Sequence, residues 1–110
     1  MPRMPSRLAA WFALVSSLLL AGCSGAGVLN SLTSSSSYTL DAGVAYGKLP
    51  RQKLDIYTPT APKPAAGWPT VVFFYGGSWN SGSRADYQFV AEALAARGVL
   101  SLVADYRLYP

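Results

Sequence analysis

The pattern of apolar and polar residues divides the chain into three parts. Residues 8–20 form an apolar run behind a short segment that carries two arginines and no acidic residue. Residues 24–37 are mostly Gly and Ser, without charge and with little periodicity. From Tyr38 onward, apolar residues recur at the spacings that are typical of strands and helices. We therefore predict one folded domain over residues 38–110.

The first half of this domain is predicted to be an antiparallel hairpin. Residues 38–46 favour β-structure but are interrupted near their middle, which indicates one kinked strand or two short ones. Residues 52–57 alternate polar and apolar side chains, which predicts a half-buried strand with Leu54 and Ile56 on its apolar face. Residues 58–69 contain four prolines and a glycine and are predicted to form a surface loop.

The second half predicts a strand, a helix and another strand. Residues 70–74 and 99–104 are continuous apolar runs, typical of strands that are buried on both faces. Between them, Ser83 begins a helix-capping pattern, residues 84–97 carry an apolar stripe, and Gly98 is expected to end the helix. Apolar strands in this order predict a parallel pair joined by a right-handed crossover. The fold class is therefore an α/β sheet that begins at an antiparallel edge.

The N-terminal segment has the order of a secretory signal peptide: positive charge, apolar run, small residues. Its apolar run is shorter than the ~20 residues that span a bilayer; a short membrane helix or a buried core helix is the alternative. Leu20-Ala21-Gly22-Cys23 resembles the lipobox of bacterial lipoproteins, which are cleaved before the cysteine. The resemblance implies a signal peptide over residues 1–22, lipidation of Cys23 and anchoring to the outer or plasma membrane of a bacterial cell envelope.

An ordinary secretory signal with a chance cysteine is the alternative to a lipoprotein signal. Residues 23–37 are rich in Gly and Ser, which predicts a flexible tether between Cys23 and the folded domain.

Composition narrows the functional classes. Hydrophobic residues make up 51% and charged residues 13% of the chain, which excludes disorder of the chain as a whole. Its 9 basic residues exceed its 5 acidic ones, but they are scattered, so no nucleic-acid-binding surface is predicted. One cysteine and no histidine exclude an internal disulfide and a Cys/His metal site. The carboxylates show no metal-ligand spacing, and we expect no metal and no cofactor.

The candidate chemistry lies at the ends of the two apolar strands. Tyr75-Gly76-Gly77-Ser78-Trp79 follows the first of them, and its glycines leave backbone N–H groups accessible to a developing oxyanion. From these residues alone, a tight turn without a catalytic role is the alternative. Asp105-Tyr106-Arg107 follows the second strand, at the same edge of the sheet. There the Asp105 carboxylate or the Arg107 donors could support the glycines; a surface ion pair is the alternative.

Three segments together resemble the N-terminal part of the α/β-hydrolases, in the group of carboxylesterases, lipases and feruloyl esterases. They are Gln52-Lys53-Leu54-Asp55-Ile56-Tyr57-Thr58-Pro59, Phe74-Tyr75-Gly76-Gly77-Ser78-Trp79 and Asp105-Tyr106-Arg107-Leu108-Tyr109-Pro110. In this family the loop reads His-Gly-Gly-x-Trp, and its backbone amides form part of the oxyanion hole. By position, the resemblance assigns Gly76 and Gly77 to the oxyanion hole, and Tyr75, Trp79 and Asp105 to support of the loop. Tyr75 stands where the family usually has histidine.

The resemblance implies a lipid-anchored serine hydrolase that acts on small-molecule carboxylic esters. Such a hydrolase uses a catalytic triad of Ser, Asp or Glu, and His, with the serine in a Gly-x-Ser-x-Gly motif. The chain has no such motif and no histidine, so Ser78 has no base to activate it. We therefore assign no catalytic residue and expect the chain to be the N-terminal portion of the hydrolase, with an apolar sheet edge at residues 71–74 that is prone to association. The alternative is a non-catalytic envelope lipoprotein, either a pseudo-hydrolase or a binding module.

Overall fold

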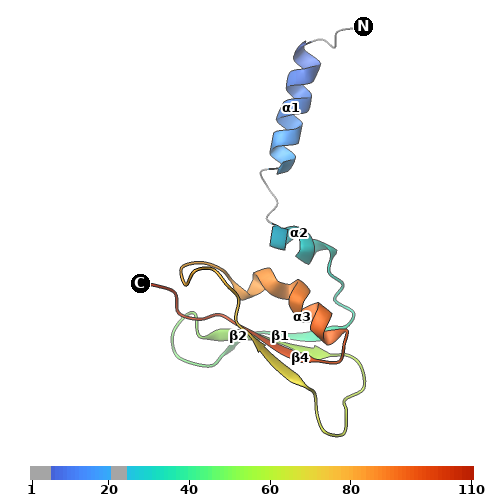
Figure 1. The fold of residues 1–110 in the computed structure, drawn as a ribbon, viewed down its shortest axis with the longest axis vertical. Helices are drawn as coiled ribbons and strands as arrows, with labels where there is room; N and C mark the ends of the chain where they lie inside the picture. The colour runs from blue at the N-terminus through green and yellow to red at the C-terminus, as the bar shows by residue number, and fades with distance from the viewer. Residues whose placement is uncertain (1–5, 21–24) are drawn as a thin grey trace.

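Four strands form one mixed sheet, the helical segment between its last two strands lies against one face, and a short helix from nearer the N-terminus packs on that segment (Figure 1). The computed structural model describes residues 6–20 and 25–110. Its elements are α1 (Ser6–Leu20), α2 (Gly25–Leu32), β1 (Tyr38–Ala45), β2 (Lys53–Pro59), β3 (Thr70–Phe73), the 3-10 helix η1 (Arg84–Tyr87), α3 (Gln88–Ala95) and β4 (Leu100–Ala104).

The strand order in the sheet is β1-β2-β4-β3. β1 and β2 pair antiparallel, β2 and β4 pair antiparallel, and β3 and β4 pair parallel. The predicted hairpin, the parallel pair and the α/β fold class are confirmed. β4 lies between the hairpin and β3, so it is the central strand that joins the two halves of the domain.

β1 is one kinked strand, as its interrupted pattern predicts. Its register against β2 shifts between Asp41 and Val44. Gly43 lies at the shift with a φ of +68°, and its N–H donates to Asp55 Oδ1 at 2.8 Å. The kink therefore turns a backbone donor toward the interior of the domain.

The segment between β3 and β4 begins and ends as its sequence predicts, but it divides into η1 and α3. Ser83 and Asp86 form the capping box: Ser83 N–H donates to Asp86 Oδ2 at 3.1 Å. At the other end Gly98 has a φ of +76°, and Val99 N–H donates to Leu94 O at 3.0 Å. This is the Schellman arrangement, which favours glycine because L side chains rarely adopt that φ.

β3 and β2 bury different residues from those that their patterns predict. The apolar run predicts a β3 buried on both faces, but its Val71 and Val72 are 39% and 49% exposed. The apolar sheet edge that we expect at residues 71–74 is confirmed, because β3 is the last strand of the sheet. The alternation in β2 predicts a buried face with Leu54 and Ile56, but α3 covers the opposite face, which carries Asp55 and Tyr57. Alternation defines two faces, and the packing of α3 decides which one is buried.

The hydrophobic core lies between the sheet and α3. Its buried members are Tyr38, Tyr57, Tyr75, Ala91, Ala95 and Val103. The two alanines of α3 have small side chains, and the larger tyrosine side chains make up most of the core beside them. Tyr38 and Tyr57 meet edge to face, with ring centroids 4.9 Å apart.

The Gly- and Ser-rich segment contains a helix where its composition predicts a flexible tether. α2 packs against η1 and α3. Asn30 accounts for this contact, because its Nδ2 donates to Ala85 O at 3.0 Å and its Oδ1 accepts from Phe89 N–H at 3.1 Å.

The apolar run near the N-terminus forms α1. Within residues 6–20 and 25–110, no helix combines the length and the apolar character needed to cross a membrane. Cys23 and the predicted cleavage site before it lie outside the described residues. The signal peptide and the lipidation of Cys23 stay predictions.

Candidate functional site

The loop that follows β3 is built around a close backbone turn. We call residues 75–82 the glycine loop. Gly77 has a φ of +152°, and its carbonyl oxygen accepts from the N–H groups of Asn80 at 3.1 Å and Ser81 at 3.2 Å. A Cβ atom on Gly77 would lie 2.2 Å from Ser81 O, so only glycine fits at this position.

The two residues after Gly77 adopt backbone angles that non-glycine residues rarely take. The φ of Ser78 is +54° and that of Trp79 is +62°. Such conformations cost of order 1–3 kcal/mol each and are concentrated at functional sites. Trp79 is held there by Tyr109, whose N–H donates to Trp79 O at 2.6 Å, and by an edge-on contact with the ring of Tyr106.

The glycine loop offers backbone donors beside a pocket. The backbone N–H groups of Gly76, Gly77 and Ser78 have no acceptor among the described residues. The pocket has a volume of about 550 Å³ and is lined by Phe74, Tyr75, Gly76, Gly77, Ser78, Trp79 and Tyr106. An apolar pocket bordered by unpaired amide donors can hold an oxygen atom that carries negative charge.

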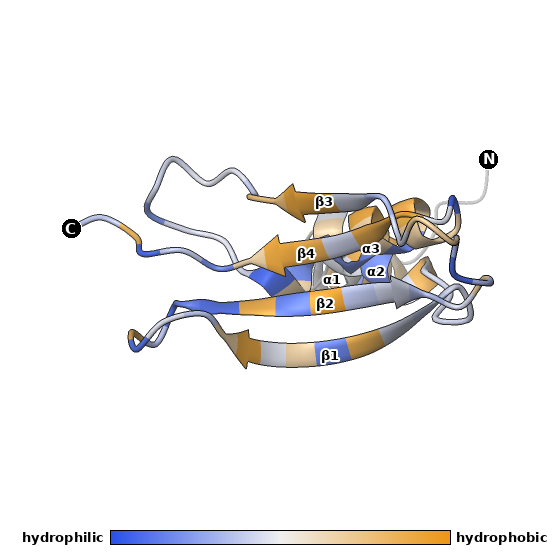
Figure 2. Cartoon of the chain, turned by 90° about the horizontal axis from the view of Figure 1, so that it is seen from below, coloured by the Kyte–Doolittle hydropathy of each residue, from blue (hydrophilic) through white to orange (hydrophobic). Residues whose placement is uncertain are grey.

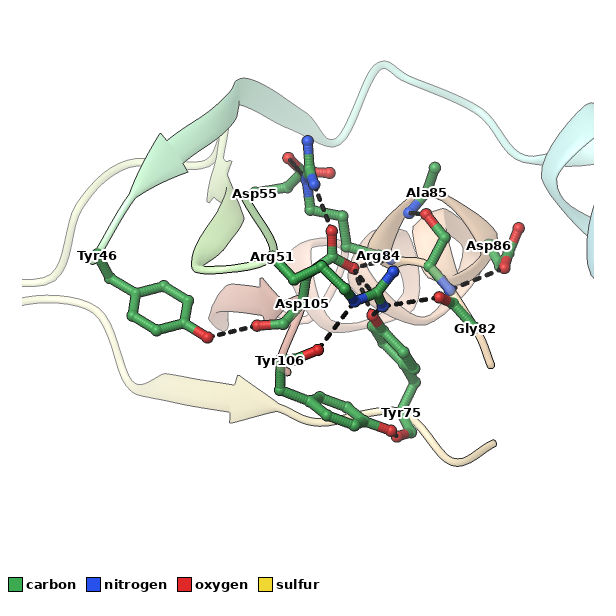
Figure 3. A network of polar contacts seen from close by, with 11 residues as sticks. Tyr46, Arg51, Asp55, Tyr75, Gly82, Arg84, Ala85, Asp86, Asp105 and Tyr106 are labelled. Atoms are coloured by element: carbon green, nitrogen blue, oxygen red, sulfur yellow. Dashed lines mark hydrogen bonds and ion pairs between the residues drawn. The ribbon is translucent and has the colours of Figure 1, made fainter. Parts of the chain in front are cut away.

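Asp105 is the centre of the polar network behind this pocket (Figure 3). Its side chain is buried, and its carboxylate accepts from the hydroxyl of Tyr75. The same carboxylate accepts from the Arg84 backbone N–H at 2.8 Å and from Arg84 Nη1 at 2.5 Å. The carbonyl oxygen of Asp105 accepts from the hydroxyl of Tyr46 at 2.5 Å. The end of β4 is thereby bound to the glycine loop, to η1 and to the connection between β1 and β2.

Tyr75 connects the glycine loop to this network. Its hydroxyl donates to Asp105 and accepts from Arg51 Nη2 at 2.8 Å. Its ring stacks on Tyr87 with centroids 5.2 Å apart. Its carbonyl oxygen accepts from the hydroxyl of Tyr106 at 2.6 Å. Tyr75 is thus held both by its side chain and by its backbone.

Three charged residues of the network are not among the predicted site residues: Arg51, Asp55 and Arg84. Arg84 Nε donates to Asp55 Oδ1 at 2.8 Å, and the Asp55 side chain is buried. A carboxylate in the middle of a half-buried strand is the one sequence signal that pointed to such a partner, because buried carboxylates are usually paired. Nothing local marks Arg51 or Arg84 as that partner.

The network fixes the protonation of its members. Burial alone would raise the pKa of Asp105, but the hydrogen bonds from Tyr75 and Arg84 outweigh it and hold that pKa below its usual value. Burial and the hydrogen bond to Asp105 raise the pKa of the Tyr75 hydroxyl well above its ordinary value. The hydrogen bond to Asp55 raises the pKa of Arg84 further. At neutral pH Asp105 is therefore an anion and Tyr75 keeps its proton.

The structure brings most of the predicted site residues together. Gly76, Gly77, Tyr75 and Trp79 border one pocket, and Asp105 lies behind it in contact with Tyr75. Arg107, which was a second possible support, is exposed. The described residues contain no group of three or more Cys, Asp or Glu that could hold a metal ion.

Comparisons with known proteins point to esterases. No protein-family model matches the chain. Over 67 residues the chain is 36% identical to the isoprenylcysteine alpha-carbonyl methylesterase of Arabidopsis thaliana and 33% identical to the kynurenine formamidase of Danio rerio. Over 72 residues it is 40% identical to the esterase LipC of Mycobacterium tuberculosis. Each match covers 61% of this chain, but only 15%, 22% and 17% of the respective relatives.

Solved structures agree on the fold. Inhibited esterase B from Lactobacillus rhamnosis matches with a TM-score of 0.67 and 25% identity, over 92% of this chain and 33% of that chain. A carbohydrate esterase from gut microbiota, at 21% identity and a TM-score of 0.53 over 69% of this chain and 28% of that chain, supports the fold alone. The mixed sheet corresponds to the N-terminal part of an α/β-hydrolase-type fold, and esterases are among both the relatives and the structural neighbours.

Proposed function

We propose that this chain supplies the oxyanion-binding half of a serine hydrolase site for carboxylic esters. The observation that carries the proposal is the row of N–H groups at Gly76, Gly77 and Ser78, which have no acceptor in the described part of the chain and lie beside an apolar pocket of about 550 Å³. Esterases of α/β-hydrolase type among the relatives support ester substrates.

In this mechanism the chain acts on the carbonyl oxygen of the ester. A serine oxygen attacks the carbonyl carbon, and the electron pair of the C=O bond moves to the oxygen. The N–H groups of Gly76 and Gly77 donate to that oxygen while it carries negative charge. When the C=O bond re-forms, the C–O bond to the alcohol breaks, and the alcohol takes the proton that the serine gave to its base. Water then attacks the acyl-serine in the same way and releases the acid and the free serine. The nucleophile and its base are supplied by residues other than these 110. Tyr75, Trp79 and Asp105 support the loop that presents the donors.

The proposal is tested on the native product that carries these residues, purified from its own cells. An affinity tag inserted beside Lys63, in the exposed loop after β2, leaves both ends of the product unchanged. Hydrolysis of p-nitrophenyl acetate is measured for the tagged protein and for Gly77→Ala. The Cβ of the alanine would collide with Ser81 O and move the donors, so we expect kcat to fall about 10²–10³-fold.

The matched control is Gly67→Ala. Gly67 also has a positive φ, +88°, but no atom lies within 4 Å of a Cβ built there, and the residue does not line the pocket. We expect kcat to stay within the range of the unsubstituted protein. A purified product with no ester turnover above buffer would contradict the proposal and favour the non-catalytic envelope module.

We also propose that the chain is anchored to a bacterial cell envelope by lipid on Cys23. The resemblance of Leu20-Ala21-Gly22-Cys23 to a lipobox supports this proposal. Several acyl chains on one residue would give durable membrane binding, whereas a single chain would not. In the same cells, we expect Cys23→Ser to move the tagged product from the membrane fraction to the soluble fraction. Ser24→Ala, which changes the next residue and keeps the thiol, is expected to stay in the membrane fraction. An unchanged distribution of Cys23→Ser would favour an ordinary secretory signal.

A further inference from the structure

Arg51 contacts both ends of the glycine loop with one nitrogen atom. Its Nη2 donates to the hydroxyl of Tyr75, the first residue of the loop, at 2.8 Å. The same Nη2 donates to the carbonyl oxygen of Gly82, the last residue of the loop, at 2.9 Å. A side chain from the connection between β1 and β2 thereby joins the two ends of the loop, and Figure 3 shows the Arg51 guanidinium between Tyr75 and Gly82.

The two ends of the loop also touch each other at this point. A Cβ atom on Gly82 would lie 2.8 Å from Cε2 of the Tyr75 ring, and the φ of Gly82 is +107°. Gly82 therefore packs its Cα against the Tyr75 ring, so the first and last residues of the loop are in contact. Arg51 donates hydrogen bonds to both of these residues.

A second nitrogen of the Arg51 side chain contacts the segment after β4. Arg51 Nε donates to the carbonyl oxygen of Tyr106, beyond the end of β4, at 2.9 Å. Its distance to the Asp105 carboxylate is longer, 3.8 Å from Nη2 to Oδ1. The short contacts are the directed hydrogen bonds, and the ion pair is secondary. A guanidinium presents several donors in one rigid plane, which a lysine ammonium cannot reproduce.

We propose that Arg51 is a positioning residue for the glycine loop: its guanidinium holds Tyr75, Gly82 and Tyr106 together so that the Gly76 and Gly77 donors keep one orientation beside the pocket. The inference rests on the proposed function for the meaning of that orientation. This three-way contact, which we call the clamp, orders the loop whether or not the chain takes part in ester turnover.

The test measures backbone order in the full 110-residue chain. The chain is labelled with ¹⁵N and kept in mild detergent, and order parameters are obtained for the amides of Gly76, Gly77 and Ser78 and for those of β4. In the unsubstituted chain we expect about 0.85 at both places, the value of rigid backbone. In Arg51→Lys we expect the loop amides to fall below about 0.6 while β4 stays near 0.85.

Arg51→Lys keeps a cation beside Asp105, so the buried carboxylate retains a charged neighbour while the three-way contact is lost. The matched control is Arg107→Lys, at an exposed arginine whose guanidinium makes no hydrogen bond within the described residues; we expect it to leave both sets of amides unchanged.

Two outcomes would overturn the inference. Loop amides that stay near about 0.85 in Arg51→Lys would show that the loop is ordered without the clamp. Equal loss of order in β4 and the loop, or loss of the fold, would make Arg51 a general support of the domain. Neither result depends on hydrolysis, so failure of the esterase proposal is seen separately, in the assay of the native product.

Discussion

At the scale of single residues, Asp105 is a buried carboxylate that stays charged. The residue is only 5% exposed, yet its carboxylate is an anion at neutral pH because Tyr75 and Arg84 direct three donors at it. Removing one partner of a buried ion pair leaves the other charge uncompensated, which costs more than the pair itself contributes. Asp105 therefore links the position of the glycine loop to the stability of the domain.

We expect Asp105→Asn to lower the free energy of unfolding by roughly 3 kcal/mol at pH 7. Because the pKa of Asp105 is lower in the folded chain than in the unfolded one, its contribution is complete above about pH 4, the usual carboxyl range, and is lost as the pH falls through the lowered pKa. Urea titrations from pH 7 downward should therefore show the gap between the two proteins narrowing below about pH 4.

Asp41→Asn serves as the matched control, because Asp41 is an exposed carboxylate on β1. We expect it to change the free energy of unfolding by less than about 0.5 kcal/mol. A gap for Asp105→Asn that stays constant down to strongly acidic pH would contradict the assignment of Asp105 as the titrating group.

The identities of the loop residues were predictable because they form a contiguous motif. Gly76 and Gly77 lie together in the sequence directly after a strand, and Asp105 follows the neighbouring strand. The residues that support them in the structure lie far apart in the sequence. Arg51 Nε and Tyr106 O come from positions 55 residues apart, and Arg84 and Asp55 from positions 29 apart. No local pattern relates such residues before the chain is folded.

At the scale of elements, α2 depends on α3 for its existence. It has eight residues, which is too short for a stable helix in isolation. Asn30 provides the link, because its side chain accepts from the Phe89 N–H in the first turn of α3, where backbone donors lack partners within the helix. The side chain of one helix thus acts as the cap of another.

We expect Asn30→Ala to melt α2 and to lower the free energy of unfolding by about 1 kcal/mol, the usual value of a lost N-terminal cap. Amide exchange at residues 28–32 should become fast, while exchange in β4 stays slow. Ser31→Ala is the matched control, because the Ser31 hydroxyl donates within α2, to Val28 O at 2.7 Å. Persistent protection of α2 in Asn30→Ala would show that apolar contacts suffice to dock it.

At the scale of the whole molecule, the described helices cover only one face of the sheet. Figure 2 looks onto the other face, with the helices behind the strands. The register places Ile56, Leu102 and Val72 side by side across three strands of that face. Val72 is 49% and the neighbouring Phe74 64% exposed. β3 is also a sheet edge, so apolar side chains and unpaired strand edge occur together.

We expect the chain to self-associate through β3, because an exposed apolar edge strand can pair with another strand. Val72→Lys should reduce the association, since a lysine on an edge strand opposes pairing. Sedimentation velocity of the full chain in density-matched detergent gives the readout. Val44→Lys, at a 39% exposed valine on the opposite edge, should leave the association unchanged, because the register shift in β1 already disrupts that edge. If both variants dissociate equally, the added positive charge rather than the β3 edge would account for the effect, which would contradict this prediction.

The sequence by itself determined the features that depend on a few neighbouring residues. The capping box at Ser83, the left-handed Gly98, the kink in β1 and the glycine loop each follow from local backbone preferences, and the strand and helix periods follow from the spacing of apolar side chains. Only the tertiary structure decided that β4 lies between β2 and β3, that β2 buries Asp55, and that Arg51 and Arg84 reach the end of β4. The physical reason is that alternation defines the two faces of a strand, whereas burial and charge pairing depend on which distant segment covers each face.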